Sequence, residues 1–187
     1  MITIKAIRGG KSNPMILKSG DQYDSRFLLY EQKESHDSPV FIDAFENCNT
    51  DPSLKFLDKK TGIMQAGILK EKLYAYLCID SQKLGKCLWL LDTEYYNKVN
   101  NESDIKEEYQ TLESIIPNPN QGGKKIIKQV AVHKGGQTEW DWSMACQTIY
   151  GPEYQRFIDH FKIGAKGYFD LIRSEYFISP KWYGQEA

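Results

Sequence analysis

The sequence KLYAYLCI at residues 72–79 is followed closely by KCLWLL at residues 86–91, after a polar turn at residues 81–85. Apolar runs of about four to eight residues between turn residues are typical of buried β-strands. Further runs of strand length, the first of them alternating, lie at residues 2–6, 26–30, 39–42 and 126–133. Strands so short and so closely spaced favour a sandwich or a barrel over alternating β–α–β units.

One amphipathic helix is expected in the C-terminal part of the chain. Pro152 suits a first helical turn. The apolar residues that follow it at helical spacing are Tyr154, Phe157, Ile158 and Phe161, a pattern that describes one buried face. Gly164 and Gly167 are expected to end the helix. We therefore predict a β-rich α+β fold, with a sandwich or barrel-like sheet and one or two short helices, one of them after Cys146, in a single domain over residues 1–187.

The composition argues against several classes of protein. The 187 residues include Lys+Arg 24 and Asp+Glu 25, a formal net charge of −1, so binding of nucleic acid through bulk positive charge is not expected. The 12 Tyr, 8 Phe and 4 Trp supply apolar area that disordered chains lack. No apolar run reaches about 18 residues, so no membrane span is expected. Residues 1–8 alternate like a strand and contain no apolar core of a secretory signal.

The cysteines and histidines form no metal site that the sequence alone reveals. The 4 Cys and 3 His are scattered, and no C-x-x-C pair occurs, so we expect neither a metal ion nor a cofactor. Cys78 and Cys87 lie in apolar runs and are expected in the core, whereas Cys48 is expected in a loop. Cys146 differs from these three, because His133 precedes it across a loop that contains glycine and tryptophan.

His133 and Cys146 are therefore candidate catalytic residues. A free thiol titrates at about 8.5, and a neighbouring imidazolium can lower this pKa so that thiolate is present at neutral pH. The histidine can then protonate a leaving amine. Gly135 and Gly136 would let the backbone approach a substrate closely, and backbone N–H groups near Cys146 would supply an oxyanion hole.

Four residues beside Cys146 are candidates for substrate binding or loop support. Ser143 and Ala145 are small and would leave the thiol reachable. Gln147 would hydrogen-bond a substrate or orient the loop. Trp142 would form the wall of a groove for sugar or peptide, or alternatively anchor the loop on the core.

This region resembles the catalytic domain of the YkuD-type L,D-transpeptidases. The sequences HKG at residues 133–135 and WSMACQTI at residues 142–149 are similar to a divergent bacterial and phage-encoded set with His-x-Gly followed by Trp-Ser-x-Gly-Cys-Gln-x-Ile. Asn118-Pro119-Asn120, Gly122-Gly123 and Glu153-Tyr154-x-x-Phe157 also resemble that set. The resemblance covers residues 115–175, which we take as the catalytic motif region.

The resemblance implies an L,D-transpeptidase-type sheet and a cysteine enzyme of the bacterial cell wall. Cys146 would attack a carbonyl of the peptidoglycan tetrapeptide stem, and the acyl-enzyme would pass to an amine or to water, as in an L,D-transpeptidase or an L,D-carboxypeptidase. His133 would act as base and acid, oriented by a backbone carbonyl of the loop. The partner would be a stem peptide or muropeptide, with no nucleic acid and no membrane span, and an immunity or delivery partner would be compatible with this role.

Three positions depart from the family motif. Met144 stands in place of histidine, Ala145 in place of glycine, and Thr148 in place of an arginine that helps to hold substrate. An alternative from another class is therefore a non-catalytic binding module or phage structural protein on the same scaffold. Since no secretory signal is visible, we expect synthesis in the cytoplasm and delivery to the periplasm or cell wall, unless a signal has been removed from this chain.

Overall fold

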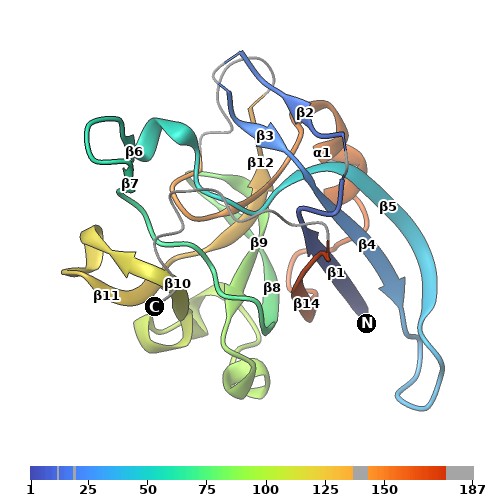
Figure 1. The fold of residues 1–187 in the computed structure, drawn as a ribbon. Helices are drawn as coiled ribbons and strands as arrows, with labels where there is room; N and C mark the ends of the chain where they lie inside the picture. The colour runs from blue at the N-terminus through green and yellow to red at the C-terminus, as the bar shows by residue number, and fades with distance from the viewer. Residues whose placement is uncertain (12, 19, 137–142, 176–187) are drawn as a thin grey trace.

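Strands that close into a barrel form the centre of the molecule (Figure 1). The structure is a computed structural model that describes residues 1–11, 13–18, 20–136 and 143–175. The barrel strands are β1 (Ile2–Arg8), β4 (Ser25–Glu31), β5 (Val40–Asn49), β8 (Leu73–Ser81), β9 (Gly85–Leu91), β12 (Ala131–Lys134), β13 (Gln147–Ile149) and β14 (Lys166–Arg173). Their order around the barrel is β1-β14-β8-β9-β12-β13-β5-β4. The β-rich character that the sequence predicts is confirmed, and of the two predicted architectures the structure has the barrel.

Two neighbouring pairs in the barrel are parallel, β1 with β14 and β12 with β13, and the other pairs are antiparallel. Outside the barrel, the described residues form three two-stranded sheets, five 3-10 helices and one α-helix. They are β2 (Met15–Ile16) with β3 (Gln22–Tyr23), β6 (Leu57–Asp58) with β7 (Ile63–Met64), β10 (Thr111–Asn118) with β11 (Lys124–Lys128), η1 (Leu54–Phe56), η2 (Thr93–Lys98), η3 (Glu102–Asp104), η4 (Glu107–Gln110), η5 (Pro119–Gln121) and α1 (Gly151–Ile158). Within the described residues, no helix is long and apolar enough to cross a membrane.

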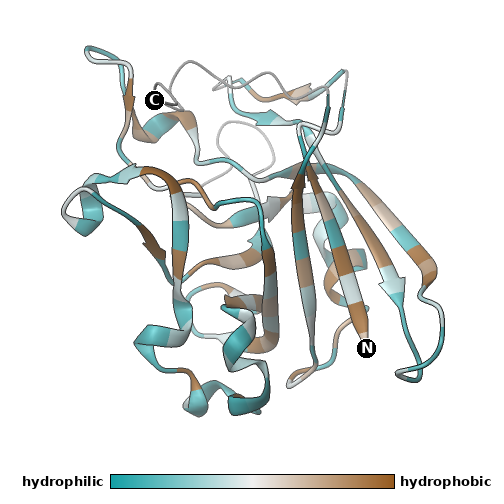
Figure 2. Cartoon of the chain, turned by 60° about the horizontal axis from the view of Figure 1, so that its bottom comes forward, coloured by the Kyte–Doolittle hydropathy of each residue, from teal (hydrophilic) through white to brown (hydrophobic). Residues whose placement is uncertain are grey.

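Alternating side chains fill the barrel, because successive residues of a strand point to opposite faces. Figure 2 shows this alternation of hydropathy along the barrel strands. The predicted helix is confirmed as α1, and Phe157 from its buried face packs against Phe27 of β4 and Phe45 of β5, with ring centroids 6.4 Å and 5.3 Å apart. The helix ends at Ile158, before the predicted glycines. Gly167 instead lies in β14, where an added Cβ would be 2.1 Å from the carbonyl oxygen of Ile2.

Two sequence-based assignments of single segments are wrong. Cys48, expected in a loop, is fully buried near the end of β5, because this strand continues well beyond the apolar run at residues 39–42. The predicted strand at residues 126–133 is divided into β11 and β12 at Gln129, whose φ of 59° is left-handed backbone. Backbone in the left-handed region cannot continue a regular β-strand. The strand is therefore interrupted at Gln129, and β11 pairs with β10 outside the barrel.

A second apolar cluster lies on the outer face of β8, β9 and β12. Its barrel residues include Leu77, Cys87 and Ala131, and Val99 and Tyr109 from the segment after β9 cover them. Residues 97–114 are largely polar and acidic in the sequence, yet Val99 is fully buried and Tyr109 is 6% exposed. Charged neighbours on the outer side of this segment conceal these two anchoring positions in the sequence.

Arg8, at the end of β1, is fully buried and joins three segments of the chain. Its guanidinium donates to the backbone oxygens of Thr50 (3.1 Å) and Leu69 (2.9 Å). It also forms ion pairs with Asp51 (3.2 Å) and Glu71 (2.5 Å). A buried charge is tolerated when ion pairs and hydrogen bonds compensate for lost hydration, so this end of the barrel depends on the whole set of contacts.

Asp24 lies beside this network and is in an unfavourable position for a charged carboxylate. Burial, together with the negative charge of Asp51, raises the pKa of Asp24 to about 6, although the Ser25 hydroxyl donates to it at 2.9 Å. The folded protein therefore holds a proton that the unfolded chain releases near pH 4. Stability from this group is present below that pH and is lost as the pH rises toward 6.

We predict that Asp24→Asn raises the free energy of unfolding by about 1–2 kcal/mol at pH 7.5, because one pKa unit corresponds to about 1.4 kcal/mol and solvent screening reduces the full shift. At pH 4 the variant and the wild type should be nearly equal, since Asp24 is then protonated in the folded protein. Urea unfolding at both pH values measures this. Destabilisation at pH 7.5 would show that the charged carboxylate stabilises the fold.

Candidate active site

The parallel pair β12–β13 places His133 and Cys146 on one face of the barrel wall. Val132 pairs with Gln147 and His133 with Thr148, so the same register continued by one residue sets Cys146 opposite Ala131. Val132 points into the barrel core and Ala131 into the outer cluster, which puts His133 and Cys146 on the outer face. Strand spacing and rise give a Cα separation of about 8 Å for such diagonal neighbours.

Both residues line one pocket, of about 300 Å³, which we call the thiol pocket. Lys83 and Leu84, in the turn between β8 and β9, form one of its walls. Asn118, Asn120 and Ile127 of the β10–β11 hairpin form another, and Ser143, Met144 and Ala145 lie next to the thiol. Hydrogen-bonding and apolar groups thus surround a reactive thiol and imidazole, as in sites for small polar ligands.

The thiol of Cys146 lies between a backbone donor and a backbone acceptor. The N–H of Ala131 donates to Sγ at 3.4 Å, and the thiol faces the carbonyl oxygen of Gln129 at 3.8 Å. The left-handed backbone of Gln129 therefore belongs to the wall of the site. Burial raises the pKa of Cys146, against smaller lowering effects from the Ala131 N–H and the charge of Lys83.

The imidazole of His133 is held by a backbone carbonyl. Its Nδ1 lies 2.7 Å from the carbonyl oxygen of Lys134, so we assign the proton to Nδ1, which donates, and leave Nε2 as the acceptor. Burial lowers the pKa of His133, and the charge of Lys83 adds to this effect. We expected an imidazolium to lower the thiol pKa, but in the structure both pKa shifts favour the uncharged thiol and the neutral imidazole.

Cys146 is half-buried, whereas the other three cysteines are fully buried. Burial raises the pKa of Cys78 to about 11 and, with smaller Coulombic contributions, that of Cys87 to about 12. Burial likewise raises the pKa of Cys48. Cys146 is therefore the thiol best placed to meet a substrate or a reagent.

Ser143 and Ala145 line the thiol pocket, where the sequence places them. The Ser143 hydroxyl donates to the carbonyl oxygen of Cys146, and its own carbonyl accepts from the N–H of Ser53 at 2.8 Å. Ser143 is 1% exposed, so it closes the turn that presents the thiol. Met144 is 47% exposed and occupies the rim.

Gly135 and Gly136 do not line the thiol pocket. A Cβ on Gly135 would be 2.2 Å from the Tyr23 hydroxyl oxygen and 3.1 Å from the carbonyl oxygen of Ile149. The Tyr23 hydroxyl also donates to the carbonyl oxygen of Gly136 at 3.0 Å. The close approach expected between these glycines and a substrate is, in the structure, an approach to the chain's own β3 and β13.

Gln147, Thr148 and Trp142 complete the predicted set. Gln147 is fully buried and its Nε2 donates to the carbonyl oxygen of Ala145 at 3.3 Å, which fits the predicted role of orienting the loop and not that of binding substrate. Thr148 is also fully buried and does not line the pocket. Trp142 lies outside the described residues.

The sequence analysis does not single out Lys83, Trp89 or Gln129, which also line the pocket. Asn118 and Asn120 were noted for the family resemblance alone; in the structure Asn118 caps η5 and the Asn120 amide reaches the carbonyl oxygen of Gln65 at 2.8 Å. The asparagine-proline sequence at residues 118–120 is therefore the sequence signal for this wall of the thiol pocket. Among the residues that the structure describes, no three His, Cys, Asp or Glu are placed to hold a metal ion.

Comparisons with protein-family models, with curated proteins and with solved structures found no match to this chain.

We predict that Gly135→Ala lowers the free energy of unfolding by about 2 kcal/mol, because the new methyl group overlaps the Tyr23 hydroxyl and crowds β13. In a Tyr23→Phe background the same change should cost clearly less, since the overlapping oxygen is gone. Urea unfolding of the four proteins of this double-mutant cycle gives the coupling energy. A coupling near zero would contradict the packing described for Gly135.

We also predict that iodoacetamide modifies Cys146 before the three buried cysteines. The rate should increase with pH past about 8.5 without a plateau near neutrality, because burial raises the thiol pKa and the imidazole is uncharged. Peptide mass mapping over pH 5.5–9.5 measures this. A rate plateau below pH 7 would instead indicate a thiolate–imidazolium pair.

Proposed function

We propose that this chain is a cysteine-dependent acyl-transfer enzyme that acts on peptidoglycan stem peptides, of the L,D-transpeptidase or L,D-carboxypeptidase type. The observation that carries the proposal is the shared pocket of His133 and Cys146 on the outer face of β12 and β13. A half-buried thiol and an imidazole whose Nδ1 is held by a carbonyl, both lining one pocket, are the two groups that general-base activation of a nucleophile uses.

In the proposed reaction, Nε2 of His133 accepts the thiol proton as Sγ of Cys146 forms a bond to the carbonyl carbon of the donor peptide. The N–H of Ala131, which donates to Sγ, stabilises the developing thiolate. When the tetrahedral intermediate collapses, the C–N bond breaks and the imidazolium returns the proton to the leaving amine. An acceptor amine or water then gives its proton to His133 and attacks the thioester, which releases the thiol.

The choice of a cell-wall peptide as substrate is supported by the resemblance over residues 115–175. Two asparagines of the turn in that resemblance, Asn118 and Asn120, line the same pocket as the thiol. Because peptidoglycan is outside the cytoplasm, the proposal includes delivery to the periplasm or cell wall and is compatible with a delivery or immunity partner.

A non-catalytic binding module is the second candidate. The raised thiol pKa of Cys146, caused by burial, and the exposed Met144 at the pocket rim favour it. An enzyme needs the imidazole to remove the thiol proton at each turnover, whereas a binding module does not. The two candidates therefore differ in whether Cys146 and His133 are needed for a covalent change in the ligand.

We predict that the wild type alters the muropeptide profile of purified sacculi and that Cys146→Ala abolishes the change. His133→Gln should lower the rate at least about 100-fold, because a general base contributes about 10²–10⁴. His36→Gln is the matched control, since His36 is an exposed histidine with a 76% exposed side chain. Chromatography of the released muropeptides measures the outcome.

The pH dependence gives a further check on the same assay. Because burial lowers the pKa of His133, activity should persist below pH 6.5, the usual pKa of histidine, and fall only when the imidazole is protonated. Identical muropeptide profiles for the wild type and Cys146→Ala would exclude the enzyme and favour the binding module.

A further inference from the structure

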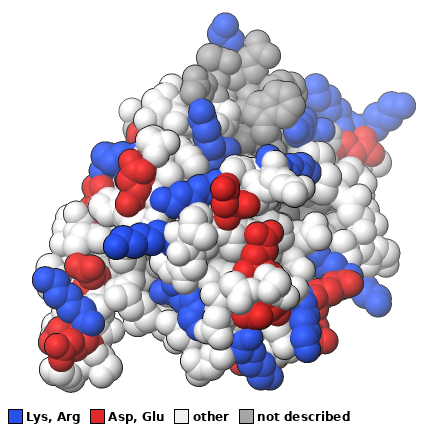
Figure 3. All heavy atoms as spheres, turned by 180° about the vertical axis from the view of Figure 1, so that it is seen from behind, with Lys and Arg blue, Asp and Glu red and all other residues white. Residues whose placement is uncertain are grey.

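The described lining of the thiol pocket is basic. No Asp or Glu occurs among the described residues that line it, although Lys83 and Lys128 both do. On the face of the molecule drawn in Figure 3, by contrast, basic and acidic side chains are interspersed. A concave site with cations and no carboxylates attracts anionic ligands, because low-dielectric walls focus the field of its charges.

The two lysines of the pocket are not equivalent. Lys128 is already neutralised, because its ammonium pairs with Glu107. Lys83 is exposed in the turn between β8 and β9, and its ammonium has no hydrogen-bond or ion-pair partner within the described part of the chain. Among the described lining residues, the uncompensated positive charge is therefore that of Lys83.

Lys83 also lines the same pocket as Cys146 and His133. Its positive charge contributes to lowering the pKa of both Cys146 and His133, as expected for a cation that acts on both sides of the pair. An anion bound at Lys83 would therefore lie within the same pocket as Sγ and the imidazole.

We propose that Lys83 binds a carboxylate of the acyl donor next to Cys146, so that the pocket selects donors with a free carboxylate near the scissile bond. This inference rests on the proposed function, which supplies the acyl donor. The neutral amide of Gln121, which also lines the pocket, suits the peptide part of such a ligand. The charge of Lys83 suits its anionic end, because carboxylate–ammonium contacts are stronger than neutral hydrogen bonds.

Two alkylating reagents of similar reactivity and size test the anion site without any substrate. Iodoacetate carries a carboxylate and iodoacetamide is neutral, and both require the thiolate of Cys146. The ratio of their rates cancels the thiolate fraction, so it reports the local charge and not the thiol pKa. We expect the iodoacetate-to-iodoacetamide ratio of the wild type to fall at least about threefold in Lys83→Gln and to fall further in Lys83→Glu.

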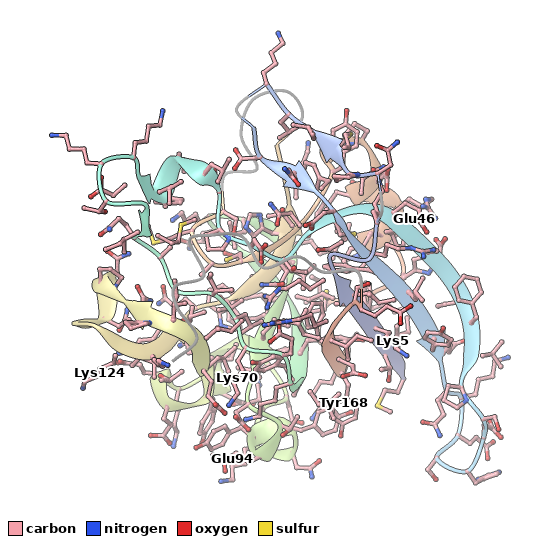
Figure 4. All side chains as sticks on the ribbon, in the orientation of Figure 1. Lys5, Glu46, Lys70, Glu94, Lys124 and Tyr168 are labelled. Carbon is pink, nitrogen blue, oxygen red and sulfur yellow. The ribbon has the colours of Figure 1, made fainter. Side chains whose placement is uncertain are left out.

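Lys124→Gln is the matched control. Lys124 is exposed at the outer part of the β10–β11 hairpin (Figure 4) and does not line the pocket, so this variant removes the same charge from another site. Lys83→Arg should keep the wild-type ratio. An unchanged ratio in Lys83→Gln, or an equal decrease in Lys124→Gln, would overturn the proposal. Cys146→Ser identifies the labelling that belongs to Cys146.

A substrate experiment separates this inference from the proposed function. The substrates are two tetrapeptide-stem donors, one with a free carboxylate and one in which that carboxylate is amidated. Lys83→Gln should increase KM for the donor with the free carboxylate and leave KM for the amidated donor unchanged, while kcat stays similar for both donors. Equal effects on the two donors would overturn the assignment of Lys83 to the donor carboxylate but would leave the proposed enzymatic function intact. If the wild type turns over neither donor, the proposed function is excluded, and the assignment of an acyl donor to the pocket is excluded with it. The ratio of the two reagent rates would still report whether Lys83 forms an anion site.

Discussion

The parallel pairing of β12 with β13 is the constraint on which the rest of the site depends. Parallel neighbours cannot be joined by a tight hairpin, so the chain must leave the wall of the barrel and return in the same direction. This crossover delivers Cys146 to the wall two positions from His133, on the same outer face. The same pairing continues through the N–H of Gly135, which donates to the carbonyl oxygen of Ile149 at 2.8 Å, and it lies between β9 and β5 in the closed barrel.

The outer face of the barrel then acquires its pocket from elements that are not part of the barrel. The β10–β11 hairpin and the turn between β8 and β9 stand beside β12 and enclose the thiol. Gln129 allows the β10–β11 hairpin to lie outside the barrel, because its left-handed backbone separates β11 from the barrel strand β12. Strained backbone of this kind persists where surrounding contacts fix it, and it is often found at functional sites.

The sequence predicts the strands best where apolar residues alternate or cluster, as in β1, β4, β8 and β9, and it predicts α1 from its apolar spacing. It fails at Cys48, since Asn47 and Asn49 on either side read as loop residues although the strand continues through them. It also fails at Gln129, where no glycine or proline marks the break. These failures share one cause: the decisive contacts are between segments distant in the chain.

The candidate site shows the same division between local and distant information. The sequence points to His133, Cys146, Ser143 and Ala145 because they are close in sequence and resemble a known motif, and the structure brings the four residues into one pocket. Gly135 was found, but its role was misread, since the nearby Tyr23 hydroxyl belongs to a strand more than a hundred residues earlier. Lys83 carries no local signal, because its turn reaches the thiol pocket only through the pairing of β9 with β12.

The neutral resting state of Cys146 has a consequence for the lifetime of the protein. Peroxides oxidise thiolates, and not thiols, to sulfenic and higher acids, and disulfide exchange also requires the thiolate. Burial keeps the Cys146 sulfur protonated until a base removes its proton. Cys146 is thus less prone to oxidation than an ionised cysteine of the same exposure would be.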